Sequence, residues 1–69
     1  MNLLEAYLEP GYHVHKMTIE EKQAQKIPVD DQVIWFDGKV NIYGAIEERH
    51  RPVYVKEWQK IKQQGYFVE

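Results

Sequence analysis

The sequence predicts a small α+β domain in which an antiparallel β-sheet packs against a C-terminal helix. A chain of 69 residues has room for one domain and one core, so we expect residues 1–69 to fold as a single unit. The residues that strands favour (Val, Ile, Tyr, Phe, Trp and Thr) make up 23 of the 69. Between residues 52 and 64, by contrast, apolar side chains recur with helical spacing.

Two short helical turns are expected in the N-terminal part. Residues 3–9 follow Asn2, a favourable N-cap, and Glu5 stands three positions later, as in a capping box. Pro10 and Gly11 then end this segment.

A strand and a second helical turn are expected next. Residues 12–17 alternate enough for a strand. Thr18 and Glu21 form another capping-box pattern, which predicts a helix as far as about Lys26. Pro28 disfavours helical geometry at the residue before it and so ends this helix.

The middle of the chain predicts a β-hairpin over about residues 32–46. The β-rich runs 33–36 and 39–43 flank Asp37 and Gly38. Asp-Gly is a favoured pair for a type I′ turn, which needs positive φ at both central residues. We therefore expect the chain to reverse at Asp37 and Gly38.

A C-terminal helix is expected over about residues 52–64. Pro52 suits the first turn of a helix, and Gly65 suits the position after its end. The apolar stripe consists of Tyr54, Trp58 and Ile61. The alternative keeps residues 51–55 as a strand, because Val53 and Val55 are β-branched. We favour a helix whose regular part begins between Pro52 and Lys56. Residues 66–68 are too few to assign, and a terminal edge strand is one interpretation.

The expected turn fixes which hairpin residues share a face, because directly opposed residues point to the same side. One face is assigned to the core and carries Val33, Trp35, Val40 and Ile42, continuing to Ile46. The other carries Ile34, Phe36, Lys39, Asn41 and Tyr43. Trp35 and Trp58 are expected to anchor the core.

The second face has two interpretations. Either the helix bearing Trp58 covers it, or its aromatic and polar side chains contact a partner, as in recognition surfaces. The second interpretation predicts a small protein-binding adaptor, inhibitor or regulatory accessory protein, or a homodimer built through this face. The partner-binding residues would be Ile34, Phe36, Lys39, Asn41 and Tyr43.

The side chains available for catalysis are few. The chain has no Cys and no Ser, and Thr18 is its single Thr. Its paired carboxylates are sequence neighbours, which point in different directions on a helix or strand and so cannot act together on one substrate atom. Its four glycines are isolated and form no phosphate-binding loop. We therefore expect no enzyme, no catalytic residues, no cofactor and no small-molecule substrate. His13, His15 and His50 lack a fixed metal-binding spacing, so surface histidines and no metal are expected.

Nucleic-acid binding is the alternative function. The net charge is −2, but residues 49–69 carry +3. The candidate contacts to phosphate are Arg49, Arg51, Lys56, Lys60 and Lys62. With the preceding strands, residues 38–62 resemble the wing and final helix of small winged-helix DNA-binding proteins such as phage excisionases. The segment 29–35, where that resemblance requires a recognition helix, is acidic and β-rich, which opposes binding to phosphate.

The sequence also predicts a compartment. No apolar run approaches the roughly 18 residues of a membrane span. Residues 1–5 lack the basic start and apolar stretch of a signal peptide. We expect a cytoplasmic protein that does not contact a membrane.

Overall fold

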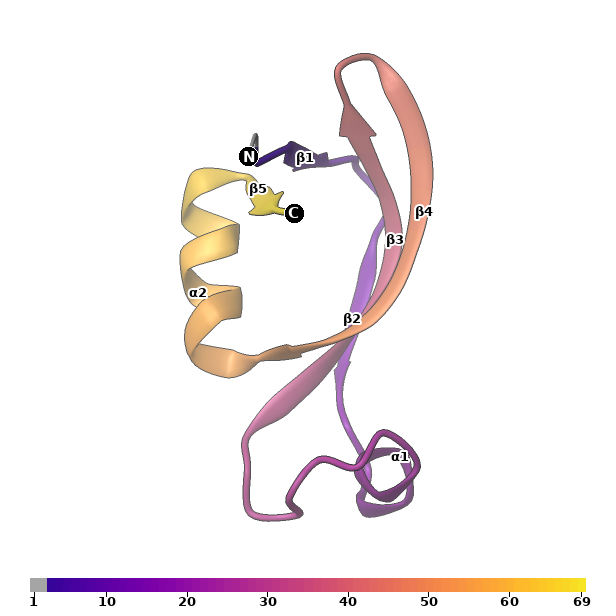
Figure 1. Cartoon of the computed structure of the whole chain (residues 1–69), viewed down its shortest axis with the longest axis vertical. Helices are drawn as coiled ribbons and strands as arrows, with labels where there is room; N and C mark the ends of the chain where they lie inside the picture. The colour runs from indigo at the N-terminus through magenta and orange to yellow at the C-terminus, as the bar shows by residue number, and fades with distance from the viewer. Residues whose placement is uncertain (1–2) are drawn as a thin grey trace.

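The computed structural model describes residues 3–69, which form one curled antiparallel sheet of five strands and two helices (Figure 1). The α+β class expected from the sequence is thus confirmed. In chain order the elements are β1 (Glu5–Leu8), β2 (His13–Lys16), α1 (Ile19–Ala24), β3 (Val33–Ile42), β4 (Ala45–Tyr54), α2 (Val55–Gln64) and β5 (Tyr66–Val68).

A long hairpin of β3 and β4 is the framework of the sheet. All ten residues of each strand are paired, from Val33 with Tyr54 to Ile42 with Ala45. The other edge of β3 pairs with β2 along its first half and with β1 near its end, and β1 in turn pairs with β5. The sheet curls around α2, which lies on its concave side (Figure 1).

The hairpin reverses at Tyr43 and Gly44, not at Asp37 and Gly38 as the sequence suggested. Tyr43 has φ +51° and Gly44 has φ +88°, and a type I′ turn requires positive φ at both positions. The side-chain oxygen of Asn41 accepts a hydrogen bond from the N–H of Gly44 at 2.7 Å and braces the turn. The predicted turn was wrong because Asp37 and Gly38 continue β3.

Gly38 serves close packing within β3. A Cβ atom at this position would lie 2.5 Å from the Cβ and 2.9 Å from the Cα of Tyr12. Leu8 lies opposite Val40, and His13 lies opposite Asp37. The step from Leu8 to His13 is five residues, whereas the step from Val40 to Asp37 on β3 is three, so two residues between β1 and β2 have no partner on β3. Tyr12 belongs to the resulting two-residue bulge and occupies the space that Gly38 leaves.

The core lies between the concave face of the sheet and α2. Because β3 continues through Gly38, Ile34 and Phe36 share a face with Val40 and Ile42, and all four are buried in one cluster. The Phe36 ring centroid lies 5.7 Å from that of Trp58 and 5.0 Å from that of Phe67. Helix α2 therefore covers the face that carries Phe36, as the first interpretation held.

The two tryptophans have different positions. Trp58 is buried in the core as expected. The expectation for Trp35 was wrong, since it points to the opposite, outer face and is only partly buried. Val33 also lies on the outer face and is buried there, whereas Ile46, expected in the core, is half exposed.

The prediction of a helix over residues 3–9 was also wrong. Its expected N-cap, Asn2, lies outside the described residues. Glu5–Leu8 form β1, with Ala6 fully buried opposite Phe67. Pairing with strands on both sides outweighs the weak local preference for a helical turn.

The other elements agree with the sequence. The Thr18 capping box is present, with the Glu21 N–H donating to Thr18 Oγ1 at 3.1 Å and the Thr18 N–H donating to Glu21 Oε1 at 2.9 Å. Helix α2 begins at Val55, within the expected range, and Gly65 ends it with φ +89°. Tyr54 precedes α2 as the last residue of β4 and is exposed, so it lies outside the buried stripe of the helix.

Candidate functional site

The residues expected to form a partner surface do not share one face. Ile34 and Phe36 are buried beneath α2. Lys39 and Asn41 project from the outer, convex face, because they alternate with the buried residues of β3. Tyr43 lies in the turn between β3 and β4. Of the five, only the last three are available to a partner.

Exposed aromatic and aliphatic side chains gather on the outer face at the turn end of the sheet. Tyr7 on β1 lies opposite Tyr66 on the neighbouring strand β5. On its other side Tyr7 lies opposite Asn41 of β3, and Asn41 in turn lies opposite Ile46 of β4. Directly opposed residues point to the same side of a sheet. We name this surface the tyrosine patch; its residues are Tyr7, Tyr43, Ile46, Tyr66 and Val68.

Two rings of the tyrosine patch, those of Tyr7 and Tyr66, are in contact. The Tyr7 and Tyr66 centroids lie 5.1 Å apart with the rings tilted by 51°. The pKa of Tyr7 is raised, chiefly by the nearby Glu5 carboxylate, with smaller effects from burial and from the hydroxyls of Tyr66 and Tyr43. Tyr7 therefore stays neutral at physiological pH, and its hydroxyl donates a long hydrogen bond of 3.5 Å to Glu5 Oε1.

Tyr43 is the most exposed residue of the tyrosine patch, with 81% of its surface open to solvent. It is one of two non-glycine residues with positive φ in the described part of the chain, the other being Lys26. Positive φ is unfavourable for a bulky side chain, and Asn or Gly is the usual residue at this turn position. Tyr43 thus combines backbone strain with an aromatic ring exposed to water.

The expected basic site is divided between two places. On the concave face, Arg49 binds Glu69 through two hydrogen bonds of 3.0 Å and Glu47 through an ion pair of 3.0 Å. These carboxylates, Glu69 above all, raise the pKa of Arg49. The guanidinium of Arg51 lies 5.0 Å from the centre of the Phe67 ring.

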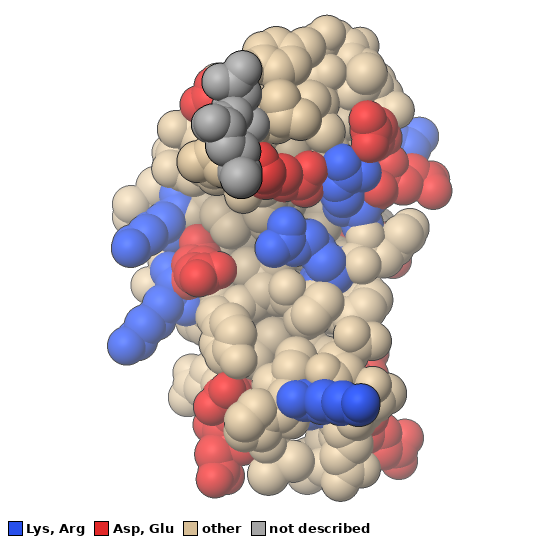
Figure 2. All heavy atoms as spheres, in the orientation of Figure 1, with Lys and Arg blue, Asp and Glu red and all other residues tan. Residues whose placement is uncertain are grey.

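The three lysines of the basic site lie apart from both arginines. They are exposed on α2, and they are Lys56, Lys60 and Lys62. Figure 2 shows acidic side chains interspersed among the basic ones on the visible face, with no continuous positive area. Residues 29–35 form a turn and the start of β3, so the recognition helix of the winged-helix resemblance is not formed.

The three histidines lie on the outer face, His13 and His15 on β2 and His50 on β4, with β3 between these strands. His13 and His50 both lie opposite Asp37, one on each side, and His50 Nδ1 is 2.6 Å from an Asp37 carboxylate oxygen. His15 instead pairs with Glu21 at 3.2 Å. Within residues 3–69 no three His, Asp or Glu side chains are grouped closely enough to hold a metal ion.

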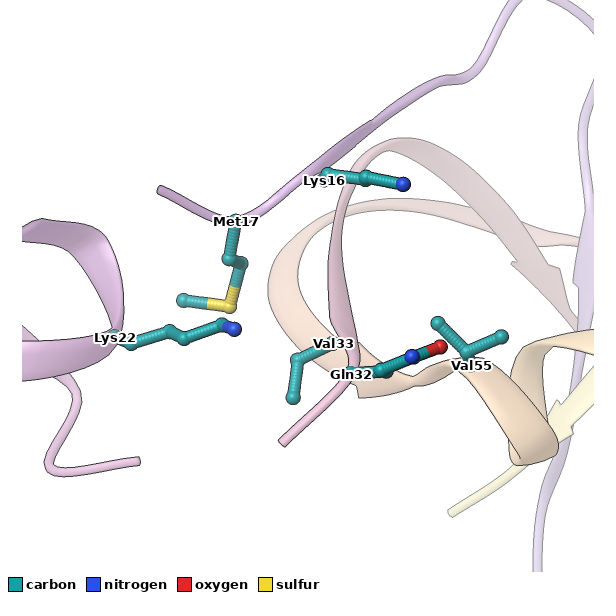
Figure 3. Close-up of a pocket in the computed structure, with 6 residues that line it drawn as sticks. All are labelled: Lys16, Met17, Lys22, Gln32, Val33 and Val55. Carbon is teal, nitrogen blue, oxygen red and sulfur yellow. The ribbon is translucent and has the colours of Figure 1, made fainter. Parts of the chain in front are cut away.

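One of the surface hollows lies between α1 and the start of α2. Its volume is about 220 Å³. Figure 3 shows the residues that line it, which are Lys16, Met17, Lys22, Gln32, Val33 and Val55. This volume is below the range of roughly 300–1,000 Å³ that is usual for ligand sites. The ammonium of Lys22 donates to the carbonyl of Val29 at 3.0 Å, which holds it in an internal contact.

A larger open depression of about 760 Å³ lies beside the start of α2. Its rim mixes carboxylates and lysines, among them Asp30 and Lys60. The hydroxyl of Tyr54 at this rim donates to Asp31 at 3.1 Å, so it is not directed at a ligand.

Most of the tyrosine patch could not be found from the sequence. Tyr7 was placed in a helix, and the misplaced turn assigned Ile46 to the core. The signal that could have revealed it is the pair Tyr43 and Gly44, which divides the β-rich stretch into two strands of equal length.

In the described part of the chain, neither helix has the length and apolar character needed to cross a bilayer. Comparison with protein-family models, curated proteins and solved structures finds no match to this chain.

Proposed function

We propose that this protein is a small, non-enzymatic protein-binding module, of the adaptor, inhibitor or regulatory type, which contacts its partner through the tyrosine patch. The observation that carries the proposal is Tyr43, strained at φ +51° and 81% exposed. Strained positions are often associated with function, since a residue that lowers stability persists when it serves another purpose. Binding is a purpose that an exposed tyrosine ring serves well.

The chemistry of the tyrosine patch suits a protein partner. Tyrosine is enriched at protein interfaces because it offers a large apolar ring and a hydroxyl while losing little conformational freedom. Ile46 and Val68 add aliphatic area, and both are about half exposed. The partner we expect has an apolar pocket for Tyr43 and hydrogen-bond acceptors for the tyrosine hydroxyls.

The variant Tyr43→Asn separates binding from folding. Asn tolerates positive φ, so we expect the variant to be more stable by about 0.5–1 kcal/mol, with a melting temperature a few degrees higher. Losing the ring should weaken partner binding by about tenfold or more. The measurement is capture of partners on immobilised wild-type and variant protein, identified by mass spectrometry, followed by titration of the purified partner.

Two further variants form a matched pair. Tyr7→Ala removes a ring within the tyrosine patch, whereas Tyr54→Ala removes a ring of similar exposure at the other end of β4. We expect Tyr7→Ala to lose the partner and Tyr54→Ala to retain it. If Tyr43→Asn and Tyr7→Ala fold and bind as tightly as wild type, the proposal is wrong.

The nucleic-acid alternative has less support. Its two arginines are engaged by Glu69 and Phe67, which leaves mainly the lysines of α2 to contact phosphate. A gel shift at low salt that disappears in Lys56→Glu/Lys60→Glu would favour this alternative over the tyrosine patch.

A further inference from the structure

In the described structure β3 is the one strand that pairs with β4, so no strand occupies the outer edge of β4. The Glu48 carbonyl at this edge accepts one hydrogen bond from Arg49 Nη1 at 3.0 Å and keeps a second lone pair for another donor. The N–H of Val55 donates to the carbonyl of Gln32 on the β3 side at 3.1 Å. Antiparallel ladders alternate, so odd-numbered residues of β4 bond to β3 and even-numbered residues direct their backbone groups outward. Pro52, which has no N–H, stands at an outward position and leaves the pairing with β3 complete.

The outward backbone groups form a ready edge for another strand. Free N–H groups are expected at Ile46, Glu48, His50 and Tyr54. Such an edge either is blocked by its side chains or accepts a partner strand. The side chains of β4 decide which partner fits, because opposed residues on two paired strands must be compatible.

The sequence of β4 is complementary to itself about Arg49. When two copies run antiparallel with Arg49 opposite Arg49, apolar residues oppose apolar ones, and each of the two glutamates opposes an arginine or a histidine. The opposed pairs are Ala45 with Val53, Ile46 with Pro52, Glu47 with Arg51 and Glu48 with His50, each occurring twice.

The backbone agrees with this register. Glu48 and His50 both direct their backbone groups outward, so each can donate its N–H to the carbonyl of the other in the second copy. The N–H of Ile46 can donate to the carbonyl of Pro52, which is the one group that a proline still offers. The missing N–H of Pro52 therefore leaves these bonds intact.

The central arginines do not oppose the pairing. Each Arg49 is already neutralised within its own chain by Glu69 and Glu47. Shifting the register by two residues in one direction puts Glu48 opposite Glu48. Shifting it in the other direction puts Arg49 opposite Arg51. The register about Arg49 places each Glu47 opposite Arg51 and each Glu48 opposite His50, which makes four such pairs in the dimer, whereas one shifted register forms two (Glu47 with Arg49) and the other forms none.

We propose that the protein forms a two-fold symmetric dimer in which the free edges of two β4 strands pair antiparallel about Arg49. The occupant of the edge is a second copy of this chain, chosen by its complementary charges and by the alignment of Ile46 with Pro52. Two curled sheets become one continuous sheet. The dimer does not rest on the proposed function, because Tyr43 lies in the turn and contributes no pair to this register; Ile46 is the one residue that the tyrosine patch shares with the paired edge.

Molecular mass measured by sedimentation equilibrium, from micromolar to millimolar protein, tests the dimer. Wild type should rise from 8.3 kDa towards twice that mass as concentration increases. Glu48→Lys puts a lysine opposite His50, and His50→Glu puts a glutamate opposite Glu48. Each variant alone should dimerise about tenfold more weakly, since Glu48→Lys removes both pairs of Glu48 with His50 and His50→Glu puts two like charges opposite each other twice. Mixed together, the two variants should form a heterodimer in which both pairs attract.

A backbone variant and a charge control complete the test. Glu48→Pro removes an outward N–H that β3 does not use, so it should fold as judged by circular dichroism but remain monomeric. Glu20→Lys makes the same charge change on the exposed surface of α1 and should dimerise like wild type. The proposal fails if the molecular mass of wild type stays at 8.3 kDa at every concentration. A monomer whose β4 edge pairs with a different protein is one form of that result. It also fails if Glu48→Lys and Glu48→Pro dimerise unchanged, or if mixing restores nothing.

Discussion

Gly38 occupies the position in β3 where a side chain has least room. An added Cβ would meet the Cα and Cβ of Tyr12 at 2.9 and 2.5 Å, so the bulge must move to accept it. The Tyr12 ring lies 5.5 Å from Phe36 and 5.6 Å from Trp58, which transmits any movement to the core. We expect Gly38→Ala to lower the free energy of unfolding by about 1–3 kcal/mol, the usual effect of overpacking.

Urea denaturation measures this loss. Gly11→Ala is the matched control, because Gly11 has open space around it and loses stability only through its positive φ of 96°. Trp58 fluorescence should change in Gly38→Ala and not in Gly11→Ala. Unchanged stability of Gly38→Ala would show that Tyr12 yields without cost.

The turn shows what the sequence can and cannot predict for a single residue. Asp-Gly and Tyr-Gly can each provide the Gly of a type I′ turn, and Asp is the better neighbour for positive φ. The choice depends on Tyr12, which lies 26 residues before Gly38 and fills the space beside it. Local turn preference carries no information about so distant a contact, so the misplaced turn also assigned the wrong residues to each face.

Helix α1 depends on its cap more than on packing. It has six residues, and none of them is buried. Isolated helices of this length are unstable in water, so the reciprocal bonds between Thr18 and Glu21 are a large part of what holds it. We expect Thr18→Ala to lower stability by about 1 kcal/mol and to increase hydrogen exchange at the N–H groups of Lys22 and Gln25.

The control for this cap is Glu21→Gln. A glutamine at this position can still accept from the Thr18 N–H, so exchange at Lys22 should stay close to wild type. Equal exchange in Thr18→Ala and wild type would contradict the role of the cap.

Elements set by local signals were predictable, and elements set by distant pairing were not. Thr18 with Glu21 and Gly65 with the Trp58 stripe identify α1 and α2 from neighbouring residues alone. Residues 5–8 carry a comparable local signal for a helix, yet they form β1. Their partners are Phe67 and Val40, and only the assembled sheet brings these residues together.

At the scale of the whole molecule, Arg49 and Glu69 join distant parts of the curled sheet. Arg49 lies on β4 and Glu69 directly follows β5, and these two strands are separated in the sheet by β3 and β1. The pair crosses the concave side through two hydrogen bonds of 3.0 Å, and both side chains are largely shielded from solvent. Charge-assisted bidentate pairs of this kind are the stronger class of ion pair. The pair therefore helps to keep the sheet curled around α2.

Stability should accordingly depend on the ionisation of Glu69. Hydrogen bonds from Arg49 hold the pKa of the Glu69 carboxyl below its usual value, which is about 4.3 in an unfolded chain. The folded protein then binds this proton less readily than the unfolded chain, so the contribution is complete above the unfolded pKa and is lost as pH falls through the folded pKa. Glu69→Gln should be less stable than wild type by about 1 kcal/mol at pH 7, with the difference shrinking below pH 4. Urea denaturation of both proteins from pH 7 to pH 2 measures this convergence, because glutamine resembles the protonated acid. A difference that stays constant across the range would mean that glutamine disturbs packing near Phe67, and that the charge of Glu69 adds nothing to the closure of the sheet.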